Sequence, residues 1–139
     1  MSVFAVIDTN VLVSALLSKH ADAATVQIVD RLYRGEIVPL ISKKIMEEYD
    51  EVLRRPKFRF PGELIRRLLE AIRQNGVDIE PVMTGEMLPD PKDLVFYEVA
   101  MTKQDDDAYL ITGNIKHFPV KPFIVTPNEM LDILRNHTT

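Results

Sequence analysis

Five short apolar segments alternate with longer helical patterns along this chain, and the alternation limits its fold more than any other feature. Apolar runs of this length, separated by helices, are typical of parallel strands that are covered by helices on both faces. The sequence therefore predicts an α/β fold with a central, mainly parallel sheet of about five strands. The expected strands are residues 3–7, 37–41, 79–82, 108–112 and 123–125, and the expected helices are residues 10–18, 23–34, 42–54, 61–75, 93–103 and 127–135.

Turn residues mark several boundaries of these elements. Gly35 and Gly76 follow two of the helical patterns, and Thr126-Pro127 is a typical start for the last one. Loops are expected at Arg55-Pro56-Lys57 and at Thr84-Gly85-Glu86. These signals agree with the strand and helix pattern along the whole chain.

The chain has 139 residues and no cysteine, which suits one domain and excludes disulfide bridges and thiolate metal sites. The apolar N-terminal segment does not resemble a signal peptide, because no basic residue precedes it and Asp8 and Asn10 interrupt it. No segment approaches the roughly 20 apolar residues that span a bilayer. We therefore expect one cytoplasmic domain over residues 1–139, without a membrane partner.

Charge is unevenly distributed, although the net charge is only -4. Residues 41–75 hold nine Lys/Arg and six Asp/Glu, whereas residues 76–110 hold two and nine. The first region could bind phosphates, through Arg54, Arg55, Lys57, Arg59, Arg66, Arg67 and Arg73. The alternative is a solvated face in which these cations pair with Glu63 and Glu70.

Asp8 directly follows the first predicted strand, and Thr112-Gly113-Asn114 follows the fourth. The carboxyl ends of parallel strands meet at one edge of a sheet, where α/β proteins place their ligands. A buried charge there needs a partner. The alternative for the second segment is a glycine turn in which Asn114 caps its own backbone.

Glu48 lies on the flank of an apolar helical stripe that is formed by Ile45, Met46, Tyr49, Val52 and Leu53. From that flank its carboxylate could face the end of the first strand. The alternative is that Glu48 belongs to a solvated acidic face with Glu47, Asp50 and Glu51.

The segment Asp90-Pro91-Lys92-Asp93 precedes a helix that is apolar almost all round and is therefore expected to be buried. Asp90 is a good N-cap, and Asp93 resembles the acidic partner of a capping box. Capping is compatible with a functional role, because an acid at a helix start has a fixed direction. The run Asp105-Asp106-Asp107 is predicted to be a solvated connection.

These four segments, in this order, resemble a PIN domain, and more narrowly the PIN-family toxin components of bacterial and archaeal toxin-antitoxin pairs. The resemblance implies a single three-layer α/β/α domain and a metal-dependent ribonuclease. It also implies that Asp8, Glu48 and Asp93 match the first three acids of the family's site, with Asp90 nearby. At the fourth position, where an acid is usual, the chain has Asn114.

Carboxylates about 5 Å apart repel one another by roughly 3 kcal/mol, so a cluster of three needs a compensating cation. All-oxygen ligands suit Mg²⁺ or Mn²⁺, and neither cysteine nor a close histidine pair supports zinc. On the resemblance, Asp8, Glu48 and Asp93 are the expected catalytic residues, and together with Asn114 they are the expected metal ligands. Thr9, Asn10, Asp90 and Thr112 are the expected supporting residues, and Arg54, Arg55, Lys57, Arg59 and Lys116 are the expected RNA contacts.

The expected activity is endonucleolytic RNA cleavage by a metal-activated water. The family resemblance also implies a small antitoxin partner and a homodimer. Two other functions remain open: a non-catalytic binding module, which Asn114 favours, and an aspartyl phosphohydrolase, which Asn10 opposes because that chemistry needs a second acid there. His117 is expected to be a loop residue bonded to backbone rather than a general acid.

Overall fold

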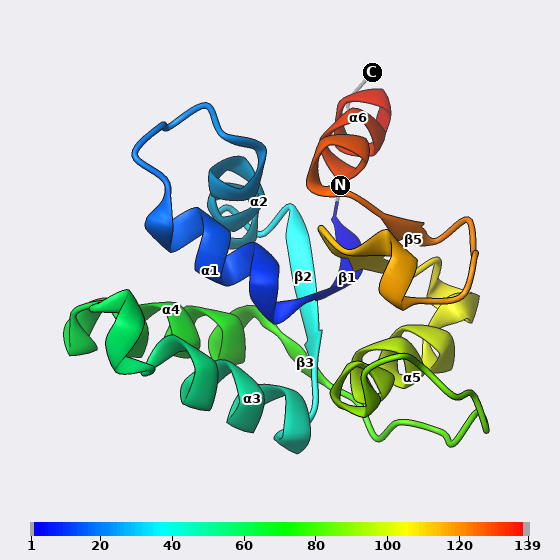
Figure 1. The fold of residues 1–139 in the computed structure, drawn as a ribbon. Coiled ribbons are helices and arrows are strands. Elements are labelled where there is room, and N and C mark those ends of the chain that lie inside the picture. The colour runs from blue at the N-terminus through cyan, green and yellow to red at the C-terminus, as the bar shows by residue number, and fades with distance from the viewer. Residues whose placement is uncertain (1, 138–139) are drawn as a thin grey trace.

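The computed structural model describes residues 2–137 and contains one all-parallel sheet of five strands in the order β3-β2-β1-β4-β5 (Figure 1). The strands are β1 (Val3–Ile7), β2 (Ile37–Ile41), β3 (Val77–Asp78), β4 (Tyr109–Ile111) and β5 (Ile124–Val125). Every strand pair is parallel. The predicted α/β class is therefore confirmed, and four of the five strands lie where the sequence placed them.

The α-helices of the described residues are α1 (Thr9–Leu17), α2 (Ala24–Tyr33), α3 (Lys43–Leu53), α4 (Gly62–Asn75), α5 (Leu94–Thr102) and α6 (Pro127–His137). Right-handed connections place α1, α2 and α4, which lie between β1, β2 and β3 in the chain, on one face of the sheet, and the return from β3 to β4 places α5 on the other face. Figure 1 shows α1, α2 and α4 on one side and α5 on the opposite side. The fold is thus a three-layer α/β/α sandwich.

The helices α3 and α5 border the carboxyl edge of the sheet. The helix α5 is apolar almost all round and packs against β1, β2 and β4, with Phe96, Tyr97, Val99 and Ala100 buried, as predicted. The helix α3 contacts α1, α4 and α5, so it lies across the carboxyl edge of the sheet between the two helical layers. Within residues 2–137, no helix is both long and apolar enough to cross a membrane.

The third strand was predicted at residues 79–82, and this is wrong. The structure places β3 at Val77–Asp78, paired with Leu40 and Ile41, and the pairing ends with a hydrogen bond from the Ile79 amide to the Ile41 carbonyl. The apolar Ile79 misled the prediction, because it is buried after the strand rather than within it. Pro81 follows and has no amide to continue the ladder.

The early start of β3 depends on Gly76, which joins α4 to the strand without a loop. A Cβ at this position would lie 2.5 Å from the Ile72 carbonyl oxygen and 2.9 Å from that of Pro39. Both atoms are backbone and cannot move away cheaply. Gly76→Ala is therefore expected to lower the free energy of unfolding by about 1–2 kcal/mol in urea denaturation.

Gly62→Ala is the matched control for this prediction. Gly62 begins α4, and no atom lies within 4 Å of where its Cβ would be placed. The control should be neutral or slightly stabilising, since alanine favours helix. Equal stability of the two variants would contradict the steric account of the α4–β3 junction.

Candidate active site

Asp8 lies at the carboxyl end of β1 and is almost fully buried, with 4% of its surface exposed. Thr112 follows β4, which pairs with β1 through Ile7 and Ile111. The Thr112 hydroxyl donates a 2.7 Å hydrogen bond to Asp8 Oδ2 and accepts one of 2.9 Å from the Asn114 amide. Thr112 therefore orients the Asp8 carboxylate and joins it to the turn after β4.

Glu48 reaches the same edge from α3. The hydroxyl of Thr9, the first residue of α1, donates a 2.5 Å hydrogen bond to Glu48 Oε2. The neighbouring Tyr49 is buried, and its hydroxyl donates a 2.5 Å hydrogen bond to the carbonyl of Ile7, directly before Asp8. These two contacts hold α3 against the end of β1 and turn the half-buried Glu48 toward it.

The solvated-face alternative for the acids of α3 is correct for the other three and wrong for Glu48. Glu47, Asp50 and Glu51 are exposed, and the last two form ion pairs with arginines one helical turn later. Of the four acids of α3, only Glu48, which bonds to Thr9 of α1, is partly buried.

The two acids of the segment before α5 have different roles: Asp90 caps a turn, whereas Asp93 faces another side chain. Asp90 accepts a 3.0 Å hydrogen bond from the Lys92 amide and caps a 3₁₀ turn, Pro91–Asp93, as predicted for an N-cap. Asp90 bonds to the amide of Lys92 rather than to that of Asp93, and Asp93 makes no capping hydrogen bond to α5, so the segment does not form the suggested capping box. The Asp93 side chain is only 14% exposed and lies 3.4 Å from the ring of His117, measured from Oδ2 to Nδ1.

The acids of this edge act on one another electrostatically. Burial raises the pKa of Asp8, and the Thr112 hydroxyl and nearby backbone amides oppose the rise. Burial is also the main cause of the raised pKa of Glu48, to which the charges of Asp8 and Asp90 add. The pKa of Asp93 rises to about 6, through burial and then through Asp8, Asp90 and Glu48. The carboxylates therefore share one site of high negative potential.

Comparison with protein families gives a match to the PIN domain over residues 5–116. The chain belongs to the PIN domain family. The matched range contains most of the chain and all the acids described above, and PIN domains are generally nucleases. No curated protein matches the chain.

The carboxylates of Asp8, Glu48 and Asp93 are suitable ligands for a divalent cation, because a shared positive charge stabilises buried carboxylates that repel one another. These carboxylates do not surround a cation completely. Within residues 2–137, no group of three or more histidine, aspartate or glutamate side chains is close enough to hold an ion by itself. Mg²⁺ tolerates such a site, since it usually keeps several of its waters.

Asn114 lies at the carboxyl edge of the sheet, in the turn after β4. The family resemblance led us to expect an acid at this position. The Asn114 side chain makes no capping hydrogen bond, so the alternative in which Asn114 caps its own backbone is wrong. Instead the backbone amide of Asn114 donates a hydrogen bond to the Thr112 hydroxyl, and the residue is half-buried. The exposed Asn10, on the first turn of α1, contributes a backbone amide that opposes the rise in the pKa of Asp8.

Two contacts of the site were missed by sequence reasoning. His117 was expected to bond to backbone, but its ring faces Asp93, and its charge opposes the rise in the pKa of Asp93 and of Asp8. Lys92 lowers the pKa of Glu48, although the two residues lie on different elements. Neither pairing has a local spacing that a sequence could reveal.

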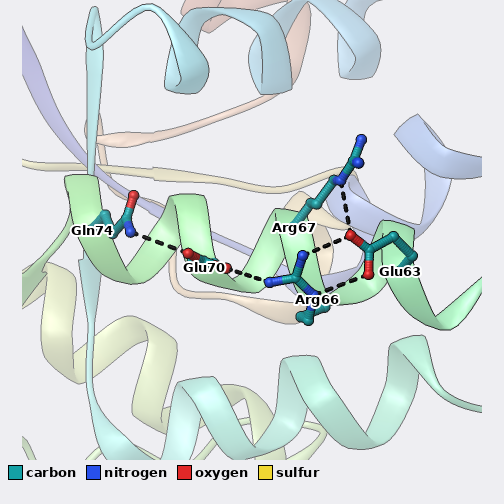
Figure 2. A network of polar contacts seen from close by, with 5 residues as sticks. All are labelled: Glu63, Arg66, Arg67, Glu70 and Gln74. Atoms are coloured by element: carbon teal, nitrogen blue, oxygen red, sulfur yellow. Dashed lines mark hydrogen bonds and ion pairs between the residues drawn. The ribbon is translucent and has the colours of Figure 1, made fainter.

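The basic segment of the PIN domain is mostly a solvated face, as its alternative interpretation predicted. Figure 2 shows Arg66 between Glu63 and Glu70 on α4, at 2.6 and 2.8 Å, and Arg67 against Glu63 at 3.1 Å. Arg54 and Arg55 pair with Asp50 and Glu51, and Lys57 lies over the ring of Phe58. Within the described residues, no ion pair joins this segment, Arg59 or the exposed Lys116 to the acids of the site.

Proposed function

We propose that this PIN domain is a metal-dependent endoribonuclease. The observation that carries the proposal is the group of three carboxylates, Asp8, Glu48 and Asp93, at the carboxyl edge of the sheet: burial raises the pKa of each, Asp8 raises that of Glu48, and both raise that of Asp93. Such a group is costly for a protein that does not use it, because each buried acid must be desolvated beside another. A divalent cation turns the same arrangement into a favourable one.

Asp8 and Asp93 would bind the metal directly, and Glu48 would bind it or hold one of its waters as a base. Thr112 and Thr9 keep the carboxylates of Asp8 and Glu48 in place through hydrogen bonds. Mg²⁺ or Mn²⁺, when bound, supplies an acidified water and a positive charge for the phosphodiester. The residues themselves supply orientation and the negative charge that retains the ion.

The test is cleavage of a panel of single-stranded and structured RNAs by the purified protein. Cleavage is expected in Mg²⁺ or Mn²⁺ and is expected to stop when a chelator is added. Calorimetry of metal binding in the absence of RNA provides an independent readout. A protein that neither binds these ions nor cleaves any RNA of the panel would instead be a non-catalytic binding module, the alternative that Asn114 favours.

The neutral Asn114 favours one tightly held metal over two, because it removes one of four negative charges. Asn114→Asp is therefore expected to strengthen Mg²⁺ binding by about tenfold, as measured by calorimetry. The new charge should also raise the pKa of the neighbouring acids further. Unchanged metal affinity and unchanged cleavage rate would place Asn114 outside the metal site.

We further propose that the protein acts in the cytoplasm as the toxin of a toxin-antitoxin pair, restrained by a small protein partner, and that it is a homodimer. The family resemblance supports the toxin role and the partner. The homodimer is supported by the apolar side chains of Leu17 and Tyr33 at the ends of α1 and α2, which are 53% and 51% exposed. The test is whether expression arrests growth, whether a neighbouring open reading frame relieves the arrest, and whether the protein sediments as a dimer.

A further inference from the structure

A cavity of about 350 Å³ lies beside Glu48, between α3 and the start of α5. Lys44 and Glu48 line it from α3, and Lys92, with the apolar residues Pro91, Leu94 and Val95, lines it from the other wall. The cavity therefore shares a wall with the acidic site and adds positive charge next to it.

The two lysines of this cavity differ from the neighbouring arginines. Arg54 and Arg55, directly after α3, form ion pairs with acids of that helix, and Arg66 forms one with an acid of α4. In residues 2–137, no ion pair or hydrogen bond engages the amino group of Lys44 or Lys92, and both residues are exposed. The charge of Lys92 acts on the nearby Glu48, but without an ion pair both ammonium groups are available to an external anion.

The shape and lining of the cavity restrict that anion. Its size is at the small end of ligand pockets, which begin near 300 Å³. Pro91, Leu94 and Val95 offer an apolar surface beside the two cations. A nucleotide combines a phosphate, which cations bind, with a flat base whose faces can pack on apolar side chains.

The larger groove between α3 and α4, about 940 Å³, is a poorer candidate. Its lining includes the acids Glu47, Asp50, Glu70 and Asp78, and its arginines Arg54 and Arg66 already have acidic partners. Lys43 and Arg73 also line this groove, but the four acids balance its four cations, so the groove offers a polyanion no net positive charge.

We propose that the cavity between α3 and α5 binds the nucleotide next to the cleaved phosphodiester of a single-stranded RNA, with Lys44 and Lys92 on its phosphate. This subsite rests on the proposed endoribonuclease function. Lys44 lies one helical turn before Glu48 on the same face of α3, so a strand held by it continues directly to the acids. The two lysines position the strand, and the acids with their metal act on the adjacent phosphate.

The test compares Lys44→Ala/Lys92→Ala with Lys43→Ala. Lys43 is the matched control, since it is an exposed lysine on the same turn of α3 but lines the other groove. Binding of a short labelled RNA of mixed sequence is measured by fluorescence anisotropy over a salt series, with Mg²⁺ present and in the Asp8→Asn background, so that the RNA stays intact. Cleavage is measured in the otherwise unchanged protein.

The double variant is expected to bind the RNA about tenfold more weakly, with the slope of log K against log[salt] reduced by about 1. Its KM should rise by a similar factor and its kcat should change much less, because the contact lies outside the reacting phosphate and Lys92 acts on the metal site only through the pKa of Glu48. The Lys43→Ala control should change neither the slope nor KM.

The outcomes separate the subsite from the proposed function. If RNA is bound and cleaved equally well by the double variant and by the unchanged protein, the cavity is not the subsite, and the endoribonuclease function stands. An equal loss in Lys43→Ala would replace the subsite with diffuse attraction by α3. If the unchanged protein neither binds nor cleaves RNA in Mg²⁺, both the function and the subsite are overturned.

Discussion

Asp8→Asn is expected to reduce metal-dependent RNA cleavage by about three orders of magnitude while leaving the protein folded. Asp8 is the most buried acid of the site, and its carboxylate faces the hydroxyl of Thr112. The substituted amide keeps the shape and the acceptor oxygen for that hydroxyl but loses the charge. It therefore loses the attraction for a divalent ion without opening a cavity.

Stability should move in the opposite direction to activity. Burial raises the pKa of Asp8, which means that its charged form is disfavoured in the folded protein. Without metal, the variant should unfold at the same urea concentration as the unchanged protein or at a higher one. A cleavage assay and a denaturation curve on the same preparation measure both effects.

Asp105→Asn is the control, because it makes the same chemical change at an exposed acid of the solvated run after α5. It should retain full cleavage. Normal cleavage by Asp8→Asn would remove Asp8 from the mechanism. A metal-free Asp8→Asn protein that is clearly less stable would show that the buried charge has a structural partner instead.

The position of Asp8 next to Thr112 could be predicted from the sequence, because the rule that carries it is simple. Both residues directly follow apolar strands, and the carboxyl ends of neighbouring parallel strands meet. The ion pairs of Arg66 with Glu63 and Glu70 were also predictable, since residues three and four apart on a helix are neighbours.

Contacts between distant elements were not predictable in this way. The hydrogen bond from Thr9 to Glu48 and the approach of His117 to Asp93 depend on how α1, α3 and α5 pack at the edge. The strand β3 was misplaced for a related reason. It is a two-residue edge strand with both residues exposed, so it has no apolar pattern of its own. Its position follows from the close fit of Gly76 against Pro39.

The second large expected effect is that the metal-free protein loses stability as the pH rises from about 4 to 6, the opposite of a protein stabilised by ordinary ion pairs. The pKa of Asp93 is raised from 3.8 to about 6 in the folded state. The folded protein therefore holds this proton more tightly than the unfolded chain. The stabilisation is complete below pH 3.8 and is lost as the pH passes about 6.

Asp93 alone should account for about 1–2 kcal/mol of this loss, after allowance for its partial exposure to solvent. Asp8 and Glu48 act in the same direction, because burial raises the pKa of each. The depressed pKa of Glu63, about 2, has the opposite sign, but that residue is fully exposed and its effect falls at lower pH. The measurement is urea denaturation with chelator at several pH values.

The double variant Asp8→Asn/Asp93→Asn isolates the effect. Its stability should depend much less on pH between about 4 and 6, and near pH 7 the metal-free variant should be more stable than the unchanged protein. Added Mg²⁺ should stabilise only the unchanged protein, and more at pH 7 than at pH 4.5, because protons and the metal compete for the same carboxylates. Identical pH profiles of the two proteins, with no response to Mg²⁺, would mean that these acids neither repel one another nor share an ion.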